Sequence, residues 1–148
     1  MNYTYNKFPH TPKRFCICDA KIDLIACQEK TVRFVFSKGF HLVSCDNIQL
    51  ASTGSIEISN CAANDFSCHV VHRETTPFGA KLFSEPIPLH ELARIVNESG
   101  RQIEIFLELY DFNCLHWRGV LLPYNMQGLS DHVVIEICGC FPMTYFWE

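Results

Sequence analysis

Five ionisable side chains toward the C-terminal end of the chain are of types that acid–base chemistry uses. They are Glu108, His116, Arg118, His132 and Glu136. Histidine titrates near neutral pH and can act as a general acid, a general base or a ligand, and a neighbouring carboxylate can orient it. If these side chains share one face of a sheet, they predict a small catalytic or ligand-binding site centred on His116. The alternative is ordinary cross-strand charge pairing on a solvated face.

Three stretches around these residues alternate apolar and polar side chains with a period of two. They are Arg101–Tyr110, Cys114–Leu122 and Asp131–Cys140. That period is typical of antiparallel strands with one buried face and one solvated face. A turn over residues 111–113 then sets Glu108 directly opposite His116.

The next strand pair is expected to add a second carboxylate beside the histidine. In the simplest register Glu136 also lies opposite His116, so the imidazole would lie between two carboxylates, which favour its charged form. Phe106, Val134 and Cys138 fall on this same face. Because a purely solvated face has no need of them, we expect either the N-terminal arm or a partner to cover it.

Nine cysteines, an odd number, include two C-x-C pairs, Cys16 with Cys18 and Cys138 with Cys140. An odd count without a signal peptide predicts free thiols in a reducing cytosol. Residues two apart in a strand share a face, so the two pairs could together hold a zinc ion with four thiolates. Structural zinc sites generally have two to four residues between paired cysteines, so this spacing favours neither a metal nor a cofactor.

A nucleophilic thiol is a further alternative. Cys114 lies two residues before His116 on the same face, and Cys138 would approach His116 in a shifted register. Cys68 and His72 also share a face, but four strand residues span roughly 13 Å, which is too far for one metal ion. The chain has no G-x-S-x-G, P-loop, G-x-G-x-x-G, H-E-x-x-H or EF-hand pattern, which lowers the expectation of an enzyme.

The elements that must position these residues are mainly strands. Pro88–Ser99 is the one predicted helix, with an apolar stripe at Leu89, Leu92, Ala93 and Val96 and a C-terminal cap at Gly100. A turn over residues 37–39 is expected to pair Thr31–Ser37 with Phe40–Ser44. The pattern predicts an α+β domain of mainly antiparallel strands, either a curled sheet or a partly open barrel, with one packed helix. Other strands are expected over residues 15–28, 48–51, 54–61, 66–73 and 79–84.

The two ends of the chain are rich in aromatic residues. Residues 1–14 are predicted to form an extended arm because they contain two prolines, and residues 15–148 are predicted to form a single β-rich domain. The last residues include Tyr145, Phe146 and Trp147. They are expected either to fold back on the body or to anchor an interface with a partner or a second copy.

Composition restricts the function classes. At 148 residues, 48% hydrophobic and 19% charged, the chain can bury a substantial core. A net charge of −4 argues against general nucleic-acid binding, and no apolar run is long enough to span a membrane. We therefore predict a small cytoplasmic binding module that recognises a protein partner or forms a homodimer. The alternative is a small enzyme or ligand-binding domain that uses the His116 cluster.

Overall fold

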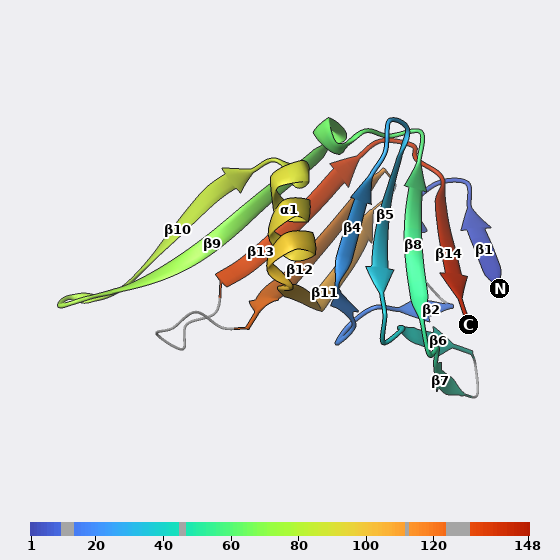
Figure 1. Cartoon of the computed structure of the whole chain (residues 1–148), viewed down its shortest axis with the longest axis horizontal. Coiled ribbons are helices and arrows are strands. Elements are labelled where there is room, and N and C mark those ends of the chain that lie inside the picture. Colours follow the sequence, from blue (N-terminus) through green and yellow to red (C-terminus); the bar gives the residue numbers. More distant parts are fainter. Residues whose placement is uncertain (10–13, 45–46, 112, 124–130) are drawn as a thin grey trace.

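The computed structural model describes residues 1–9, 14–44, 47–111, 113–123 and 131–148. Most of these residues lie in antiparallel strands, and the described part contains a single α-helix. The predicted α+β class is therefore confirmed, and the sheets are curled without closing into a barrel (Figure 1).

A five-stranded sheet has the order β1-β14-β8-β5-β4 and contains both ends of the chain. Its outer members approach from distant parts of the sequence, because β1 pairs with β14 near the two termini. In β5 and β8 every second residue is buried, so this sheet has one core face. The strands are β1 (Asn2–Tyr5), β14 (Met143–Trp147), β8 (Gly54–Ser59), β5 (Thr31–Phe36) and β4 (Leu24–Cys27).

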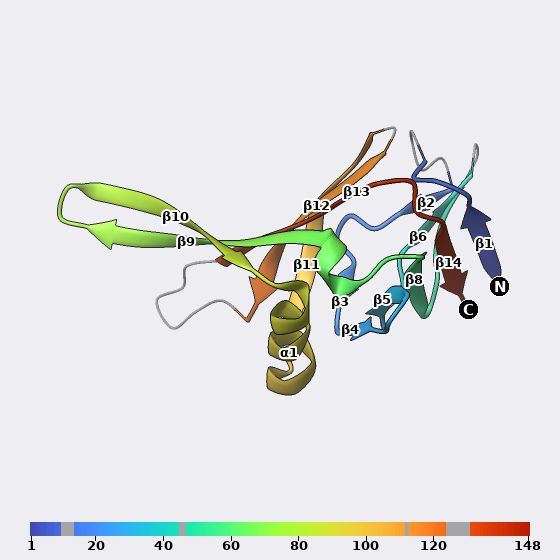
Figure 2. The same ribbon diagram turned by 90° about the horizontal axis from the view of Figure 1, so that it is seen from above.

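A six-stranded sheet has the order β10-β9-β13-β12-β11-β3 and packs against the first sheet through the shared core. Figure 2 shows its hairpin of β9 and β10 extending away from the rest of the molecule. β13 pairs with β9 only between Phe66 and Val71, so residues 72–83 continue beyond the sheet as a two-stranded ribbon. The strands are β10 (Gly79–Ile87), β9 (Phe66–Thr76), β13 (Asp131–Cys138), β12 (Cys114–Leu122), β11 (Gln102–Asp111) and β3 (Lys21–Ile22).

The pairing predicted between residues 31–37 and 40–44 is wrong. β5 pairs instead with β4 and β8, which give it longer ladders, and after β5 ends at Phe36 the chain turns through Gly39. Gly39 has a positive φ of 71°, and a Cβ there would collide with the carbonyl oxygen of Ala51. The following residues form β6 (His41–Val43) and β7 (Ile48–Leu50), which join β2 (Phe15–Cys16) in a small third sheet.

The helix α1 spans Leu89–Ser99, one residue shorter than predicted because Pro88 is its N-cap. Its predicted apolar stripe is confirmed, since all four of its residues are buried, and Gly100 ends the helix in the left-handed conformation. α1 packs against β4 and β9, and so lies across the junction of the two large sheets. A short 3₁₀ helix, η1 (Ala63–Asp65), precedes β9.

The ends of the chain belong to the folded body. Along the predicted arm, residues 2–5 form an edge strand, and Phe8 is buried against Phe141. β14 lies between β1 and β8, and Tyr145 is fully buried, with its ring stacked on that of Phe15. Tyr145 is therefore a core residue and cannot be an exposed anchor for a partner.

Candidate functional site

The outer face of the six-stranded sheet carries most of the predicted site. The predicted register between the second and third C-terminal strands is confirmed, because His116 lies opposite Glu136 and Trp117 lies opposite Ile135. His116 Nδ1 and Glu136 Oε1 are hydrogen-bonded. His132 lies on the same face, where its ring makes an edge contact with that of Phe106.

Arg118 occupies the other side of the His116 ring. Its Nε–H donates to His116 Nε2 at 2.9 Å, so Nε2 must be unprotonated. The ring proton therefore lies on Nδ1 and is donated to Glu136. Because both ring nitrogens are hydrogen-bonded, His116 holds the side chains of Glu136 and Arg118 in fixed positions on this face.

The polar residues line a shallow groove of about 470 Å³ on this face. Strands β9 to β13 all contribute to it, and its walls combine charged, aromatic and aliphatic side chains. The groove is lined chiefly by His69, Leu82, Phe106, Arg118, His132 and Glu136. A mixed lining of this kind is suited to binding, since apolar groups give contact area and a few polar groups fix orientation.

Glu108 does not join this groove, and the register predicted for it is wrong. Ile105 lies opposite Gly119, whereas Leu107 lies opposite Arg118, so Phe106 is an extra residue in β11. This β-bulge shifts all later pairs by one position and sets Glu108 opposite Trp117, on the core side. The shifted register extends to the end of the ladder, because β11 continues to Asp111 and Asp111 lies opposite Cys114, the first residue of β12.

Glu108 is held on the core side by a polar network. Its Oε1 accepts a hydrogen bond from the Ile17 amide at 3.1 Å, and its Oε2 accepts one from the Tyr110 hydroxyl at 3.0 Å. Tyr110 in turn lies 3.1 Å from the hydroxyl of Tyr145 and receives a hydrogen bond from Trp117 Nε1 at 3.4 Å. Burial raises the pKa of Glu108, and the donors from Ile17 and Tyr110 partly offset this effect.

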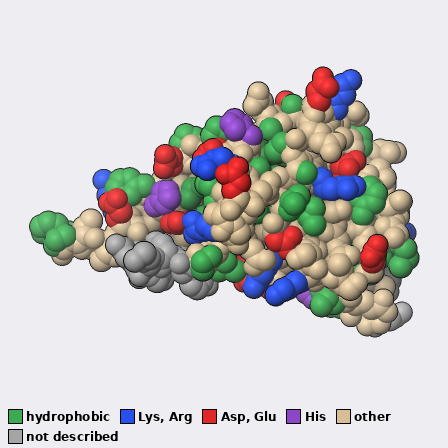
Figure 3. All heavy atoms as spheres, in the orientation of Figure 1, with side chains coloured by type: hydrophobic (Ala, Val, Ile, Leu, Met, Phe, Trp, Pro, Cys, Tyr) green, Lys and Arg blue, Asp and Glu red, His purple; other side chains and the backbone are tan. Residues whose placement is uncertain are grey.

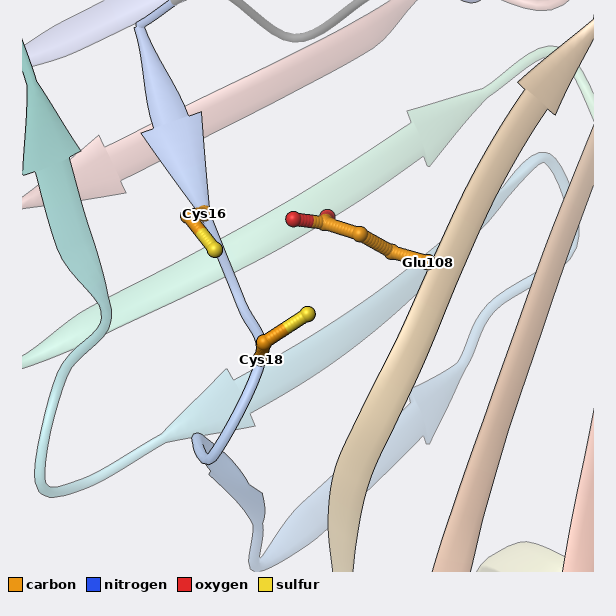
Figure 4. A group of neighbouring side chains, drawn as sticks. All are labelled: Cys16, Cys18 and Glu108. Carbon is orange, nitrogen blue, oxygen red and sulfur yellow. The ribbon is translucent and has the colours of Figure 1, made fainter.

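Two thiols approach the same carboxylate. The metal-binding atoms of Cys16, Cys18 and Glu108 all lie within 4.8 Å of one another (Figure 4). Burial is the main cause that raises the pKa of Cys16 to about 12, and it also raises the pKa of Cys18. The sequence pattern did not reveal this grouping, because the bulge that turns Glu108 inward interrupts a stretch with regular alternation. Gly119, a glycine inside a strand, was the available signal of that bulge.

The two C-x-C pairs are not brought together. Cys138 is bonded to Cys114 in a disulfide across β12 and β13, with their Cα atoms 4.2 Å apart. Cys140 is exposed and donates to the Asn113 side chain. The expectation of free thiols holds for the other described cysteines, Cys16, Cys18, Cys27, Cys61, Cys68 and Cys140. Neither thiol that was considered as a nucleophile beside His116 is free.

Apolar side chains are exposed on the projecting hairpin, which we define as residues 72–83. Phe78 at its tip is fully exposed, and Leu82 and Phe83 are 68% and 38% exposed. Figure 3 shows the apolar tip at the far end of the molecule. In the C-terminal strand, Phe146 and Trp147 are partly buried, and the Arg33 guanidinium lies over the Phe146 ring.

Comparisons with known proteins give no relative. No protein-family model, no curated protein and no solved structure matches the chain. Within the residues that the structure describes, no helix has the length and apolar character needed to cross a membrane. Functional inference therefore depends on the geometry of the chain itself.

Proposed function

We propose that this chain is a protein-binding module whose contact surface is the projecting hairpin together with the adjoining outer face of the six-stranded sheet. The observation that supports the proposal is the hairpin itself. It extends beyond all its neighbouring strands while it exposes Phe78, Leu82 and Phe83. An isolated two-stranded ribbon is marginally stable in water, and exposed aromatic and aliphatic side chains are typical anchors of protein interfaces.

The outer face continues this surface toward the centre of the sheet. Phe106 is 44% exposed and lies beside the groove, which Leu82 of the hairpin also lines. Arg118 and Glu136, both hydrogen-bonded to His116, add polar groups of fixed orientation. Preorganised polar groups around apolar anchors favour a specific partner over nonspecific association.

The first experiment compares two double variants that each replace two exposed apolar side chains with the same pair of polar residues. F78S/L82E removes the anchors of the hairpin, and the matched control I48S/L50E changes two exposed residues on β7, each 65% exposed. Light scattering after gel filtration tests self-association, and affinity capture with quantitative mass spectrometry tests heterologous partners. Circular dichroism checks that each variant is folded.

If the wild type self-associates, we expect F78S/L82E to dissociate that oligomer, and if it captures a partner, we expect F78S/L82E to lose at least tenfold of it, while I48S/L50E behaves as the wild type. If both variants retain the same oligomer and the same captured proteins, the hairpin is not the contact surface. A monomeric wild type with no partner whose capture depends on the hairpin would also reject the proposal.

The second candidate is a small ligand-binding domain that uses the groove. The volume of the groove and its mixture of His132, Arg118 and Phe106 support this candidate. A thermal-shift screen against small carboxylates and phosphates, repeated with R118A, distinguishes the two candidates, because a ligand held by Arg118 would stabilise only the wild type.

A further inference from the structure

Two chain segments place metal-ligating groups at one point on the core side of β11. Cys16 ends β2 and Cys18 follows it, while Glu108 comes from β11. Their two sulfur atoms and one carboxylate oxygen lie within 4.8 Å of one another, and this is the one such group among the described residues. Figure 4 shows all three side chains directed toward a common point.

Local structure explains why both thiols face the carboxylate. The side chain of Ile17 is fully buried in the core. Because side chains alternate along an extended segment, Cys16 and Cys18, which flank Ile17, share the opposite face and can both approach Glu108. The segment is also fixed to β11 by backbone hydrogen bonds. Asp19 N donates to Ile105 O at 2.6 Å.

The carboxylate is oriented before any ion arrives. Glu108 Oε1 accepts a hydrogen bond from Ile17 N, and Oε2 accepts one from the Tyr110 hydroxyl. The Cys16 thiol is a further hydrogen-bond partner of this carboxylate, and zinc would take the place of its proton. The Tyr110 hydroxyl has a single proton, which it donates to Glu108, so its hydrogen bonds with Trp117 and Tyr145 are those of an acceptor. Hydrogen bonds to a ligating carboxylate are the usual second layer of protein metal sites.

Burial acts on all three side chains in the same direction. It is the largest cause that raises the pKa of Cys16, of Cys18 and of Glu108. The two thiols therefore keep their protons in the metal-free protein, and a bound divalent cation would stabilise their thiolate forms in this partly buried place.

We propose that Cys16, Cys18 and Glu108 bind a zinc ion, with a water molecule as the fourth ligand. Two thiolates select zinc over magnesium or calcium, and a carboxylate is a common third ligand. In a tetrahedral site the sulfur atoms lie about 3.8 Å apart, as zinc–sulfur bonds of about 2.3 Å require. The three groups therefore need to approach by only about 1 Å, within the reach of side-chain rotation.

Binding converts the two thiols to thiolates and releases two protons, so the zinc complex carries a net charge of −1 with Glu108 ionised. The ion would join β2 of the small sheet to β11 of the six-stranded sheet. This joining of the two sheets is independent of the hairpin surface proposed above. Zinc bound only by the folded chain also stabilises the fold.

The test uses the full-length protein, reduced with a phosphine that does not bind zinc strongly and then incubated with zinc chloride. Native mass spectrometry is expected to show one added zinc ion per chain. Maleimide labelling with peptide mapping is expected to show that zinc protects Cys16 and Cys18, while labelling of Cys27 and Cys140 is unchanged. Both measurements use the wild-type chain, so they do not depend on whether a variant folds.

Variants then assign the ligands. C16S/C18S should lose zinc, and E108Q should weaken its binding more than about tenfold, whereas C140S should bind as the wild type does. Cobalt(II) gives a second measurement, because thiolate ligation produces charge-transfer absorption that C16S/C18S removes. A folded wild type that retains no zinc, or zinc that protects all exposed cysteines equally, would overturn the proposal. Equal loss in C140S would overturn it as well.

Discussion

Phe106 decides which side of β11 each later residue occupies. Before the bulge, Glu104 lies on the outer side and forms an ion pair with Lys21. After the bulge, Glu108 and Tyr110 face the core, and the outer side carries Phe106 and the exposed Leu109. One inserted residue therefore makes the outer face more apolar and brings a carboxylate to the two thiols.

Tyr145 joins the aromatic core to the Glu108 network. Its ring stacks on Phe15 with centroids 4.1 Å apart, and its hydroxyl lies 3.1 Å from that of Tyr110. We predict that Tyr145→Ala lowers the free energy of unfolding by about 3–5 kcal/mol through cavity formation. Tyr145→Phe should lower it by about 1 kcal/mol, because it removes only the hydrogen bond.

Urea denaturation followed by tryptophan fluorescence measures both losses, and Phe78→Ala on the exposed hairpin is the control expected to leave stability unchanged. An equal loss in the two Tyr145 variants would mean that the hydroxyl, and not the ring, holds this part of the core together.

Cysteine reactivity should follow burial. Cys68 is 3% exposed, and burial raises the pKa of its thiol to about 12, whereas Cys140 is exposed. Because the thiolate is the reactive form, we predict that iodoacetamide at pH 8 labels Cys140 within minutes and leaves Cys68 unlabelled in the native protein. Peptide mapping of native and urea-unfolded samples measures this difference. Rapid native labelling of Cys68 would indicate that β9 opens readily.

At the scale of elements, β12 adapts to the bulge beside it through Gly119. A Cβ at this position would lie 2.6 Å from the Ile103 side chain and 2.8 Å from the carbonyl oxygen of Glu104. The backbone contact cannot move without disturbing the ladder between β11 and β12. We therefore predict that Gly119→Ala destabilises the fold by about 1–3 kcal/mol through overcrowding.

Thermal unfolding followed by circular dichroism measures the effect of Gly119→Ala. Gly79→Ala at the hairpin tip is a useful comparison, since a Cβ there meets no atom, and any loss reflects only its positive φ of 125°. A Gly119→Ala variant as stable as the wild type would show that the bulge can relax without this glycine.

Elements with strong local patterns could be predicted from the sequence. The apolar stripe and Gly100 placed α1 within one residue, and inward Ile135 and Ile137 fixed the register of β12 with β13. The same reasoning failed for Glu108, because an inserted residue changes faces without breaking the visible alternation. It also failed for residues 40–44, because β5 pairs with the distant β8 and leaves residues 41–43 to pair with β2 and with the next strand, β7.

At the scale of the whole molecule, one edge strand of each large sheet can be compared: β4 is covered by other parts of the chain, whereas β10 is exposed. The edge strand β4 is covered by α1, where the Asn97 amide takes the place of a neighbouring strand. Its Oδ1 accepts from Ile25 N at 2.9 Å, and its Nδ2 donates to Ile25 O at 2.8 Å. β10, the edge of the other sheet, is exposed along nearly its whole length, which agrees with a role in contacting a partner.

Asn97 thus connects the helix to the sheet edge, and its replacement should affect the fold as a whole. We predict that Asn97→Ala lowers the free energy of unfolding by about 1 kcal/mol, because two backbone groups of Ile25 lose their partners. Asn97→Asp should lower it more, since a carboxylate oxygen then faces the carbonyl of Ile25. Chemical denaturation measures both, with His90→Ala on the exposed face of α1 as the control.

Loss of this cover should also expose β4 to edge-to-edge association. We therefore expect both Asn97 variants, but not His90→Ala, to scatter light at lower temperature during heating. If Asn97→Asp were as stable and as soluble as the wild type, α1 would be held to the sheets by its apolar stripe alone. The hydrogen bonds between Asn97 and Ile25 would then contribute nothing measurable to holding the two sheets together.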